Sequence, residues 1–306
     1  MESPRSVRAV LAGVLTDLGV SPAGLRYRAL RGGFNNRSYL VAAGERRWVV
    51  KIRSETLGPL LTVAAEAEVM AAAARAGLAP AVLAHDEAAG LLVTEYRPGA
   101  RSLSTRAARE RGNIERIAAL LRRLHAVAAP VAPFAVERVA QRYVEAAAAG
   151  AERKIARARR NWSQYQADWD DGTRPFIEWA DELAALARRF ESAFPATVLC
   201  HNDLAAANLL DDGQLVLVDF EYAVLAAPIL DLANLAVMNR YSDRERAALL
   251  EAYDGRGEID PGELRWVARL VALLGWFWAA ANERRASEPA VYTRIRGDLS
   301  AQLEAG

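Results

Sequence analysis

The hydrophobic residues near the start of the chain recur at the spacing of one helix face. This face is formed by Val7, Val10, Leu11, Val14, Leu15 and Leu18. Residues three and four positions apart lie on the same side of an α-helix, so the pattern predicts a helix that buries this side. Ser3-Pro4 is typical of a helix start and Gly19 of a helix end.

Short apolar runs with the length of β-strands follow this helix. They cover residues 25–30, 37–43, 46–52, 81–85 and 91–95. Gly44 joins the second and third runs, as in a β-hairpin. After the third run the pattern predicts a helix over 62–76, which ends at Gly77 with Pro80 beyond it. Five antiparallel strands and a helix before residue 96 predict a small α+β unit.

The pattern becomes mostly helical after Pro98-Gly99. Two amphipathic helices are marked by Ile114, Ile117, Leu120, Leu121 and Leu124, and by Ile177, Ala180, Leu183, Leu186 and Phe190. Between them, residues 137–160 are polar and basic, which is typical of a solvated helix.

A short β insertion interrupts these helices. It comprises residues 197–200, 208–210 and 215–218. Helices then resume, and Asp260-Pro261 begins a long apolar one. The chain therefore predicts an α+β, bilobal architecture. Residues 1–96 would form a small lobe with a five-stranded antiparallel sheet, and residues 97–306 a large, mainly helical lobe. A cleft between two such lobes is a natural ligand site.

Composition argues against several functional classes. The 306 residues carry 39 basic and 38 acidic side chains, and a net charge of +1 disfavours binding to nucleic acid or membranes through bulk charge. A single cysteine, Cys200, excludes an intramolecular disulfide and a CxxC motif. The longest apolar run, residues 270–281, is shorter than the roughly 20 residues that span a bilayer. The first residues lack a signal-peptide pattern, so we expect a cytoplasmic protein.

Two polar motifs carry the chemistry. They are His201-Asn202-Asp203-Leu204-Ala205-Ala206-Ala207-Asn208 and, eleven residues later, Asp219-Phe220-Glu221. Both are predicted to follow short strands, where loops present side chains from a rigid support. The residue types fit phosphoryl transfer, in which Asp203 accepts the proton of a hydroxyl while Asn208 and Asp219 hold Mg²⁺. The five-residue step from Asp203 to Asn208 matches a kinase catalytic loop.

Lys51, one of only two lysines in the chain, follows the apolar run at 48–50. A charge in such a strand must be paired or bound to a ligand, because burying it alone costs several kcal/mol. Kinase-type folds use a strand lysine to contact the α- and β-phosphates and pair it with a glutamate of the next helix. Glu66 and Glu68 are both candidates for this partner, and the count back from Pro80 favours Glu66.

The glycine pair at 32–33 lies between two predicted strands and is followed by Asn35 and Asn36. Glycines there would allow backbone N–H groups to approach a phosphate, so Gly33, Asn35 and Asn36 are candidate nucleotide contacts.

Three further residues near the motifs are given structural roles. Asp231 is a charge among apolar residues and is expected to tie down the loop at 201–208 through hydrogen bonds. We expect His201 to shape the same loop by packing and hydrogen bonding rather than to act as a base. Cys200 is expected to be a small buried apolar residue.

At these positions the sequence resembles the choline kinase, aminoglycoside phosphotransferase and thiamine kinase families, which share a protein-kinase-like fold. The resemblance covers most of the chain and rests on the Gly-Gly-Phe-Asn-Asn-Arg-Ser-Tyr opening at 32–39, Lys51, Glu66, Thr94-Glu95-Tyr96, Leu124-His125, the motif at 201–210, the Asp-Phe-Glu-Tyr-Ala motif at 219–223 and the Asp-Leu-Ala motif at 231–233. The combination is most similar to choline and ethanolamine kinases.

The resemblance implies a role for each motif. Asp203 would be the catalytic base, and Asn208 and Asp219 the Mg²⁺ ligands. The implied ATP contacts are Lys51, Glu66, Gly33, Asn35, Asn36 and the backbone of Glu95 and Arg97, the last two holding the adenine.

One departure from the family pattern bears on the acceptor. Choline kinases carry two tryptophans spaced by three in a C-terminal helix, where they help to cage the quaternary ammonium. Here Trp276 and Trp278 are spaced by two, which turns them to faces about 200° apart. One of them could line a cation cage with Tyr222 or Tyr292, and Glu221 could supply negative charge. An aromatic cluster in an apolar helix can also be core, so both interpretations stay open.

Together these features predict an ATP- and Mg²⁺-dependent kinase of a small cationic alcohol, with choline or ethanolamine favoured. An aminoglycoside phosphotransferase is the first alternative. Polycationic substrates favour an acidic pocket, whereas residues 260–306 carry six acidic and six arginine side chains. A thiamine kinase also stays open. A pseudokinase scaffold would be expected to lose one of the residues Lys51, Asp203, Asn208 and Asp219, and all four are present.

Overall fold

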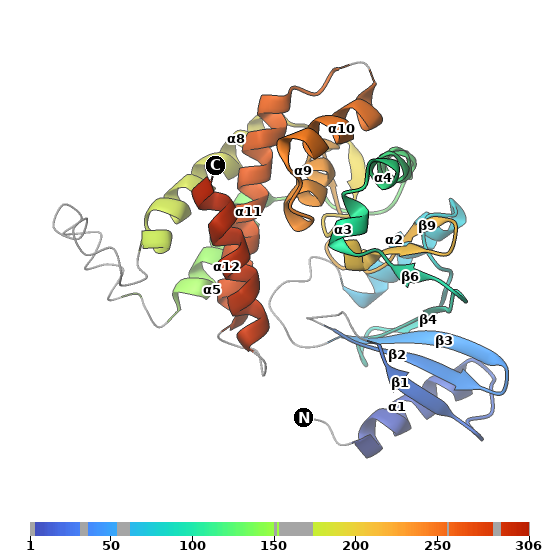
Figure 1. Cartoon of the computed structure of the whole chain (residues 1–306). Helices are drawn as coiled ribbons and strands as arrows, with labels where there is room; N and C mark the ends of the chain where they lie inside the picture. Colours follow the sequence, from blue (N-terminus) through green and yellow to red (C-terminus); the bar gives the residue numbers. More distant parts are fainter. Residues whose placement is uncertain are drawn as a thin grey trace.

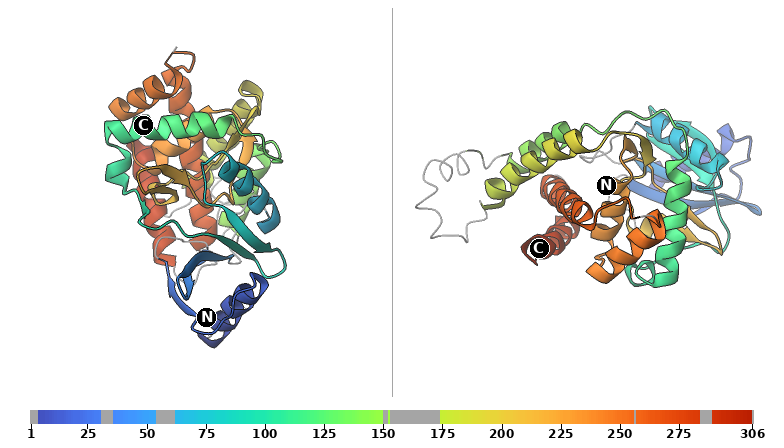
Figure 2. Two further views of the ribbon diagram at one scale, coloured as in Figure 1. Left: turned by 90° about the vertical axis from the view of Figure 1, so that its right-hand side faces the viewer. Right: turned by 90° about the horizontal axis from the view of Figure 1, so that it is seen from above.

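The computed structural model describes residues 4–30, 36–53, 62–149, 152, 174–255, 257–283 and 289–305. A sheet with one flanking helix forms one end of the molecule, and helices form most of the rest (Figure 1). Figure 2 shows the same division from two further directions. The predicted α+β, bilobal architecture is confirmed.

The sheet lobe contains one five-stranded antiparallel sheet, as predicted. Its strands are β1 (Arg26–Ala29), β2 (Asn36–Ala43), β3 (Arg46–Arg53), β4 (Val82–Asp86) and β5 (Leu91–Glu95), in the spatial order β1-β2-β3-β5-β4. Gly44 has a φ of 60° in the β2–β3 turn, a conformation that glycine adopts without strain. Lys51 lies in β3, opposite Ser38 on one side and Leu92 on the other.

Two helices accompany the sheet, and they belong to different cores. Helix α1 (Pro4–Asp17) buries Leu11 and Leu15 against one face of the sheet, in a cluster that contains no residue of the helical lobe. Helix α2 (Val63–Arg75) is capped by Thr62, whose side chain accepts from the N–H of Ala65. The buried residues of α2 form one cluster with those of the helical lobe.

The end of α2 is also hydrogen-bonded to the helical lobe. The N–H of Leu217 donates to the carbonyl of Leu78 at 2.8 Å. The side chains of Arg123 and Gln214 donate to the carbonyls of Ala76 at 2.6 Å and Gly77 at 3.1 Å. Helix α2 therefore lies between the sheet and the helical lobe and is attached to both.

The helical lobe is built around one long helix. Its described helices are α3 (Thr105–Ala108), α4 (Arg111–His125), α5 (Val136–Ala148), α8 (Glu178–Ala193), α9 (Ile229–Met238), α10 (Asp243–Asp254), α11 (Pro261–Glu283) and α12 (Pro289–Ala305), with 3-10 turns η2 (Arg174–Phe176) and η3 (Ala206–Asn208). Helix α11 packs against α5, α8, α9 and α12. It is the one described helix long and apolar enough to cross a membrane, and 72% of its most apolar window is buried inside the fold.

Short strands carry the polar motifs, as expected, in two small sheets. One contains β6 (Arg101–Ser102), β8 (Leu209–Asp211) and β9 (Leu215–Leu217), and the other pairs β7 (Val198–Cys200) with β10 (Val224–Ala226). Strands β6 and β10 were not predicted, because two or three residues give no detectable alternation.

The interpretation of residues 137–160 as a solvated helix is wrong over its first half. Helix α5 ends at Ala148 and buries Ala140, Tyr143 and Ala147, spaced as one helix face. This face packs against α8 and α11. The long charged side chains between these residues hid the apolar face in the sequence. Residues 153–160 lie outside the described part of the chain.

Candidate active site

The loop that leaves β7 positions Asp203, and Asn208 fixes its orientation. The side-chain amide of Asn208 donates to the Asp203 carboxylate at 2.8 Å and to its backbone carbonyl at 2.9 Å. These two hydrogen bonds between residues five positions apart hold the Asp203 carboxyl group against the side chain of Asn208. Desolvation, and then repulsion by the carboxylates of Asp219 and Glu221, raises the pKa of Asp203 to about 7.

Helix α9 holds the backbone of this loop. Asn234 accepts from the N–H of Leu204 at 2.6 Å and donates to the carbonyl of Asn202 at 3.2 Å. Asn239 accepts from the N–H of Ala206 at 3.0 Å and donates to the carbonyl of Leu204 at 2.8 Å. The sequence analysis missed both asparagines, although two buried amides in and just after an apolar helix are a signal that could have revealed them.

Asp231 ties down the same loop, as predicted. Its carboxylate accepts from the backbone N–H groups of His201 at 2.9 Å and Asn202 at 2.8 Å. His201 is fully buried, with Nε2 3.1 Å from the carbonyl of Val218 and its ring against Phe220. Burial lowers the pKa of His201, so the imidazole is neutral in its packing role. The prediction that His201 shapes the loop is confirmed.

Lys51 is the centre of a buried ion-pair cluster. Its Nζ lies 2.7 Å from Oε1 of Glu66, contacts Oδ1 of Asp219, and lies 3.3 Å from Oε2 of Glu221. Burial would lower the pKa of Lys51, but these carboxylates outweigh it and raise the pKa above its usual value. Glu66 is 1% exposed whereas Glu68 is exposed, so the partner left open between them is Glu66.

Arg53 binds the other oxygen of the same glutamate. Its guanidinium lies 2.7 Å from Oε2 of Glu66. Arg53 follows Lys51 by two positions in β3, so both side chains leave the same face of the strand. The sequence analysis did not single out Arg53, although this spacing was visible once the strand was predicted.

Glu221 faces the sheet lobe in this cluster. Its Oε2 accepts from the side-chain amide of Asn36 at 2.7 Å, in addition to its contact with Lys51. Burial is the main cause that raises the pKa of Glu221. The carboxylate predicted to contact an acceptor thus lies against the lysine. The predicted contacts Gly33 and Asn35 lie outside the described residues.

The segment between the lobes contains the predicted adenine contacts. The backbone N–H of Glu95 donates to the carbonyl of Ala81 at 2.9 Å. The side chain of Arg97 binds both oxygens of Asp212, in the β8–β9 turn, at 2.9 Å. The side chain of Arg97 therefore joins this segment to the helical lobe, a function that its sequence context did not reveal.

The structure gives the two tryptophans different surroundings. Trp276 is 3% exposed, and its Nε1 donates to Ser300 of α12 at 3.0 Å. Its indole packs against the rings of Trp179 and Phe176. Trp276 is therefore core, and its prediction as a substrate contact is wrong, because the face it shares with α8 and α12 is covered.

Trp278 lies toward the polar motifs instead. Its Nε1 donates to the hydroxyl of Tyr222 at 3.1 Å, and its ring lies 5.5 Å from that of Tyr292. Tyr222 follows Glu221 directly, and the charges of Glu221 and Asp203 act on its hydroxyl. Trp278 is thus the tryptophan that lies beside Tyr222 and Tyr292, and its role in a cation cage stays a prediction.

The residues present fit a hard divalent cation. Asn208 uses its amide nitrogen on Asp203, so its side-chain oxygen is the atom that could ligate a metal. Asp219 follows Val218, whose N–H donates to the carbonyl of Asn208 at 3.1 Å, and this brings the two predicted ligands together. Magnesium prefers such oxygen donors. Acidic side chains outnumber basic ones in the cluster. The basic side chains are Lys51 and Arg53, and the acidic ones are Glu66, Asp203, Asp219 and Glu221.

Comparisons with known proteins identify the family of the chain. The phosphotransferase enzyme family matches residues 26–267. Protein LicA of Haemophilus influenzae is 28% identical over 226 residues, which cover 72% of this chain and 61% of LicA. The chain thus spans less than two thirds of the length of that curated relative.

Two crystal structures share the fold over nearly the whole chain. A choline/ethanolamine kinase family protein from Mesorhizobium loti superposes with a TM-score of 0.73 and 25% identity, covering 98% of this chain and 93% of that one. Choline kinase LicA from Streptococcus pneumoniae superposes with a TM-score of 0.71 and 19% identity, covering 97% and 99%.

Proposed function

The chain belongs to the phosphotransferase enzyme family, and from this premise we propose that it transfers the γ-phosphate of ATP to the hydroxyl group of an amino alcohol, choline or ethanolamine. One observation carries the proposal. Four separate segments bring the buried Lys51 and Glu66 and the half-buried Asp203 and Asp219 into one cluster of charges. A strand lysine paired with a helix glutamate, next to a base and a metal-binding carboxylate, is the arrangement that phosphoryl transfer from ATP needs.

Each residue of the cluster has a task in this reaction. Lys51 would bind the phosphate oxygens of ATP, and Glu66 would hold Lys51 in place. Asp203 would accept the proton of the attacking hydroxyl. A pKa near 7 suits this task, because a general base works best when its pKa lies near the operating pH. Asn208 and Asp219 would hold Mg²⁺, which neutralises charge on the phosphates when bound.

The nucleotide would lie between the lobes. The N–H of Glu95 is bonded within the sheet and the carbonyl of Arg97 accepts from Ala100, so we expect the carbonyl of Glu95 and the N–H of Arg97 to face the adenine. Backbone N–H groups near Asn36 would approach the phosphates, together with those of the predicted contacts Gly33 and Asn35.

The acceptor would lie on the helical side, next to Asp203. Trp278, Tyr222 and Tyr292 offer aromatic faces, and an ammonium group is attracted to such faces. The negative charge of the cluster favours the same cation. These features support an amino alcohol, a small molecule with one charge. A polycationic aminoglycoside would need acidic side chains over a wider surface, and residues 260–306 have none in excess. The likeness to choline kinases named above supports the same choice over thiamine.

An ATP-consumption screen tests the proposal. The acceptors are choline, ethanolamine, thiamine, an aminoglycoside and a simple sugar, each with Mg²⁺ and with either the wild type or Asp203→Asn. We expect turnover with choline or ethanolamine that depends on Asp203. Turnover only with another acceptor would reject the amino alcohol, and turnover that survives in Asp203→Asn would reject the site.

A further inference from the structure

A series of hydrogen bonds holds the backbone of the loop after β7. It starts at Tyr253 and passes through His125 and Asp231. Asp231 of α9 accepts from the N–H groups of His201 and Asn202 at 2.9 and 2.8 Å. Its Oδ2 also lies 3.1 Å from Nε2 of His125, the last residue of α4. Nδ1 of His125 lies 2.6 Å from the hydroxyl of Tyr253 in α10. Three helices and the loop are thus joined in one series.

The chemistry of the groups sets the direction of each hydrogen bond. The carboxylate of Asp231 can only accept, so the proton of the imidazole lies on Nε2 of His125. When the ring carries only this proton, Nδ1 accepts from the hydroxyl of Tyr253; when it carries two, Nδ1 donates to the hydroxyl oxygen, so the contact is kept in both states. Burial first, and then the neighbouring Cys200 and Asp231, raise the pKa of Tyr253 to about 12, so its hydroxyl keeps the proton that it donates.

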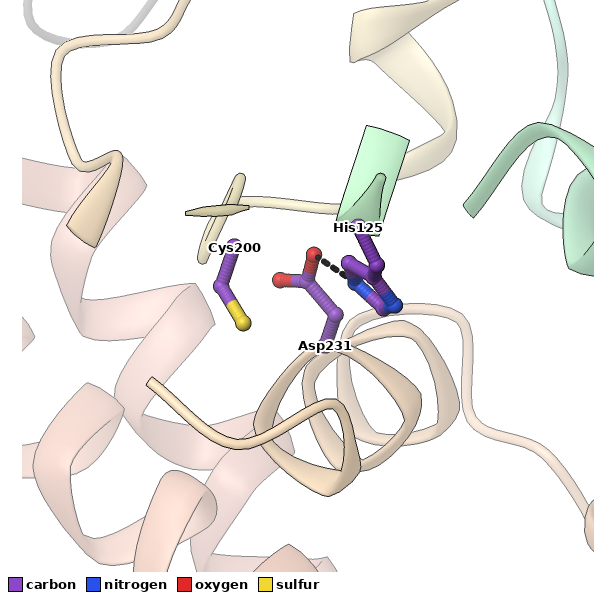
Figure 3. Close-up of side chains that lie close together, drawn as sticks. All are labelled: His125, Cys200 and Asp231. Atoms are coloured by element: carbon purple, nitrogen blue, oxygen red, sulfur yellow. Dashed lines mark hydrogen bonds and ion pairs between the residues drawn. The ribbon is translucent and has the colours of Figure 1, made fainter. Parts of the chain in front are cut away.

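The inner part of the series is enclosed by protein, whereas Tyr253 at its outer end is half-buried. The side chains of His125 and Asp231 are 4% and 0% exposed. Figure 3 shows the Asp231 carboxylate between the imidazole of His125 and the side chain of Cys200. Cys200 donates its thiol proton to the carbonyl of Ala227 at 3.5 Å. In such surroundings each polar atom needs its partner, because an unsatisfied buried group costs about 1–3 kcal/mol.

Tyr253 is itself held in place from the opposite side. Arg122, one turn before His125 in α4, donates to the carbonyls of Ala252 and, at 3.2 Å, Tyr253. The tyrosine ring also meets the imidazole edge to face, with centroids 5.6 Å apart. The hydroxyl therefore has a fixed position relative to Nδ1 of His125.

The loop takes an uncommon backbone conformation directly before Asp203. Asn202 has a φ of 59°, in the left-handed region, which asparagine adopts more readily than most other residues but which still has to be held by the surrounding contacts. Its N–H is one of the two bonded to Asp231, and Asp203 is the next residue. A change in the orientation of the Asp231 carboxylate would therefore release the backbone directly before Asp203.

We propose that Tyr253 is a positioning residue of this loop, which acts through His125 and Asp231 to hold Asp203 in place. His125, Cys200 and Asp231 also offer the donor types of a zinc site, since one atom of each lies within 4.8 Å of the others. However, Asn202 occupies Oδ1 of Asp231, and His201 and His125 occupy Oδ2. The proposal rests on the proposed function only where it concerns turnover.

The first experiment does not need the reaction. Hydrogen exchange of the peptide that contains residues 201–204 is compared in the wild type, Tyr253→Phe and Tyr241→Phe. Tyr241→Phe is the matched control, because it removes a buried hydroxyl that donates to the carbonyl of Ala108 at 2.6 Å instead of to His125. We expect exchange roughly 2- to 10-fold faster in Tyr253→Phe alone, the effect of losing one hydrogen bond. Equal exchange in the three proteins would overturn the proposal.

The second experiment measures turnover of ATP with choline. We expect Tyr253→Phe to lower kcat by roughly 2- to 10-fold with both KM values unchanged. His125→Gln should lower kcat as well, and the double variant should be no slower than the slower single one, since both break the same series. A rise in KM without a fall in kcat, or additive losses, would contradict the proposal. An inactive wild type would reject the proposed function, and hydrogen exchange would still decide the role of Tyr253.

A metal analysis completes the test. We expect the purified protein to contain no stoichiometric zinc and its melting temperature to be unaffected by a chelator. Zinc that is bound by the wild type and lost in Cys200→Ala would replace the hydrogen-bond series with a metal site and overturn the proposal.

Discussion

The carboxylate of Glu66 joins two cations of the same strand, with Lys51 on Oε1 and Arg53 on Oε2, each at 2.7 Å. A carboxylate held at both oxygens cannot rotate without breaking one ion pair. Helix α2, which also belongs to the core of the helical lobe, therefore helps to fix the lysine ammonium, together with Asp219 and Glu221. This relationship leads to the first prediction.

Glu66→Gln should weaken ATP binding roughly 10- to 100-fold, because it removes the charge from hydrogen bonds worth about 1.5–3 kcal/mol. Glu68→Gln provides the matched control. Glu68 lies two positions further along the same helix and is exposed, so its variant should bind ATP normally. Isothermal titration calorimetry measures both. Equal affinities in the two variants would show that Glu66 does not position Lys51 for the nucleotide.

Asp203→Asn should abolish most turnover and leave ATP binding nearly intact. Asparagine keeps the shape of the side chain but cannot accept a proton, and general-base catalysis contributes typically ~10²–10⁴-fold. Steady-state kinetics with the acceptor found in the screen gives kcat, and calorimetry gives the affinity for ATP. A kcat near that of the wild type would remove Asp203 from the role of base.

Asp219→Ala should weaken the binding of ATP in the presence of Mg²⁺. The variant deletes a carboxylate oxygen from a cation that takes few ligands from the protein. It also removes one of the carboxylates around Lys51, so ATP binding must be titrated both with and without Mg²⁺. We expect the difference between the two titrations to shrink. A difference as large as in the wild type would mean that other residues hold the metal.

Trp276→Leu should lower the stability of the protein, whereas Trp278→Leu should weaken binding of the acceptor. Trp276 is core, so its variant should lose about 2–4 kcal/mol of unfolding free energy and keep its acceptor KM. Trp278 contacts Tyr222, so its variant should raise the acceptor KM by roughly 2- to 30-fold, the value of one cation–π contact. Chemical denaturation and steady-state kinetics separate the two. An unaltered acceptor KM in Trp278→Leu would remove the aromatic cage.

Cys200 should be a reporter of unfolding. It is the single cysteine, fully buried, and burial is the main cause that raises the pKa of its thiol. Only the thiolate reacts with disulfide reagents such as DTNB. At pH 8 we therefore expect no reaction in the folded protein and complete reaction after denaturation. Fast labelling of the folded protein would show that β7 opens readily.

Most of the fold was predictable because the sheet lobe and the amphipathic helices have long, regular patterns. Gly44 and Gly77 mark turns that the chain then makes. Strands β6 and β10 were not predictable, since their two or three residues pair with strands distant in the sequence. Helix α5 was predicted but described wrongly, because the apolar face around Tyr143 is narrow and charged side chains flank it.

The site residues that could be predicted from the sequence are those whose residue type and spacing are compatible with few chemical roles. Asp203, Asn208 and Lys51 were identified because their spacing and surroundings permit few other roles. The sequence could not show whether Trp276 is a core residue or part of a cation cage. The answer depends on its hydrogen bond to Ser300, which lies 24 residues later in another helix. The same limit applies to the asparagines that hold the loop from α9, because their hydrogen bonds span about 30 residues.

The attachment of α2 to both lobes has a mechanical consequence. Hydrogen bonds from Leu217, Arg123 and Gln214 connect the end of this helix to the helical lobe, whereas Lys51 belongs to a strand of the sheet. If the sheet moves away from the helical lobe while these hydrogen bonds hold, β3 is displaced along α2 and Lys51 moves away from Glu66. Such a movement leaves buried charges without partners, which costs about 3–5 kcal/mol. The Lys51–Glu66 ion pair therefore opposes separation of the lobes and keeps the ammonium group where the proposed reaction needs it.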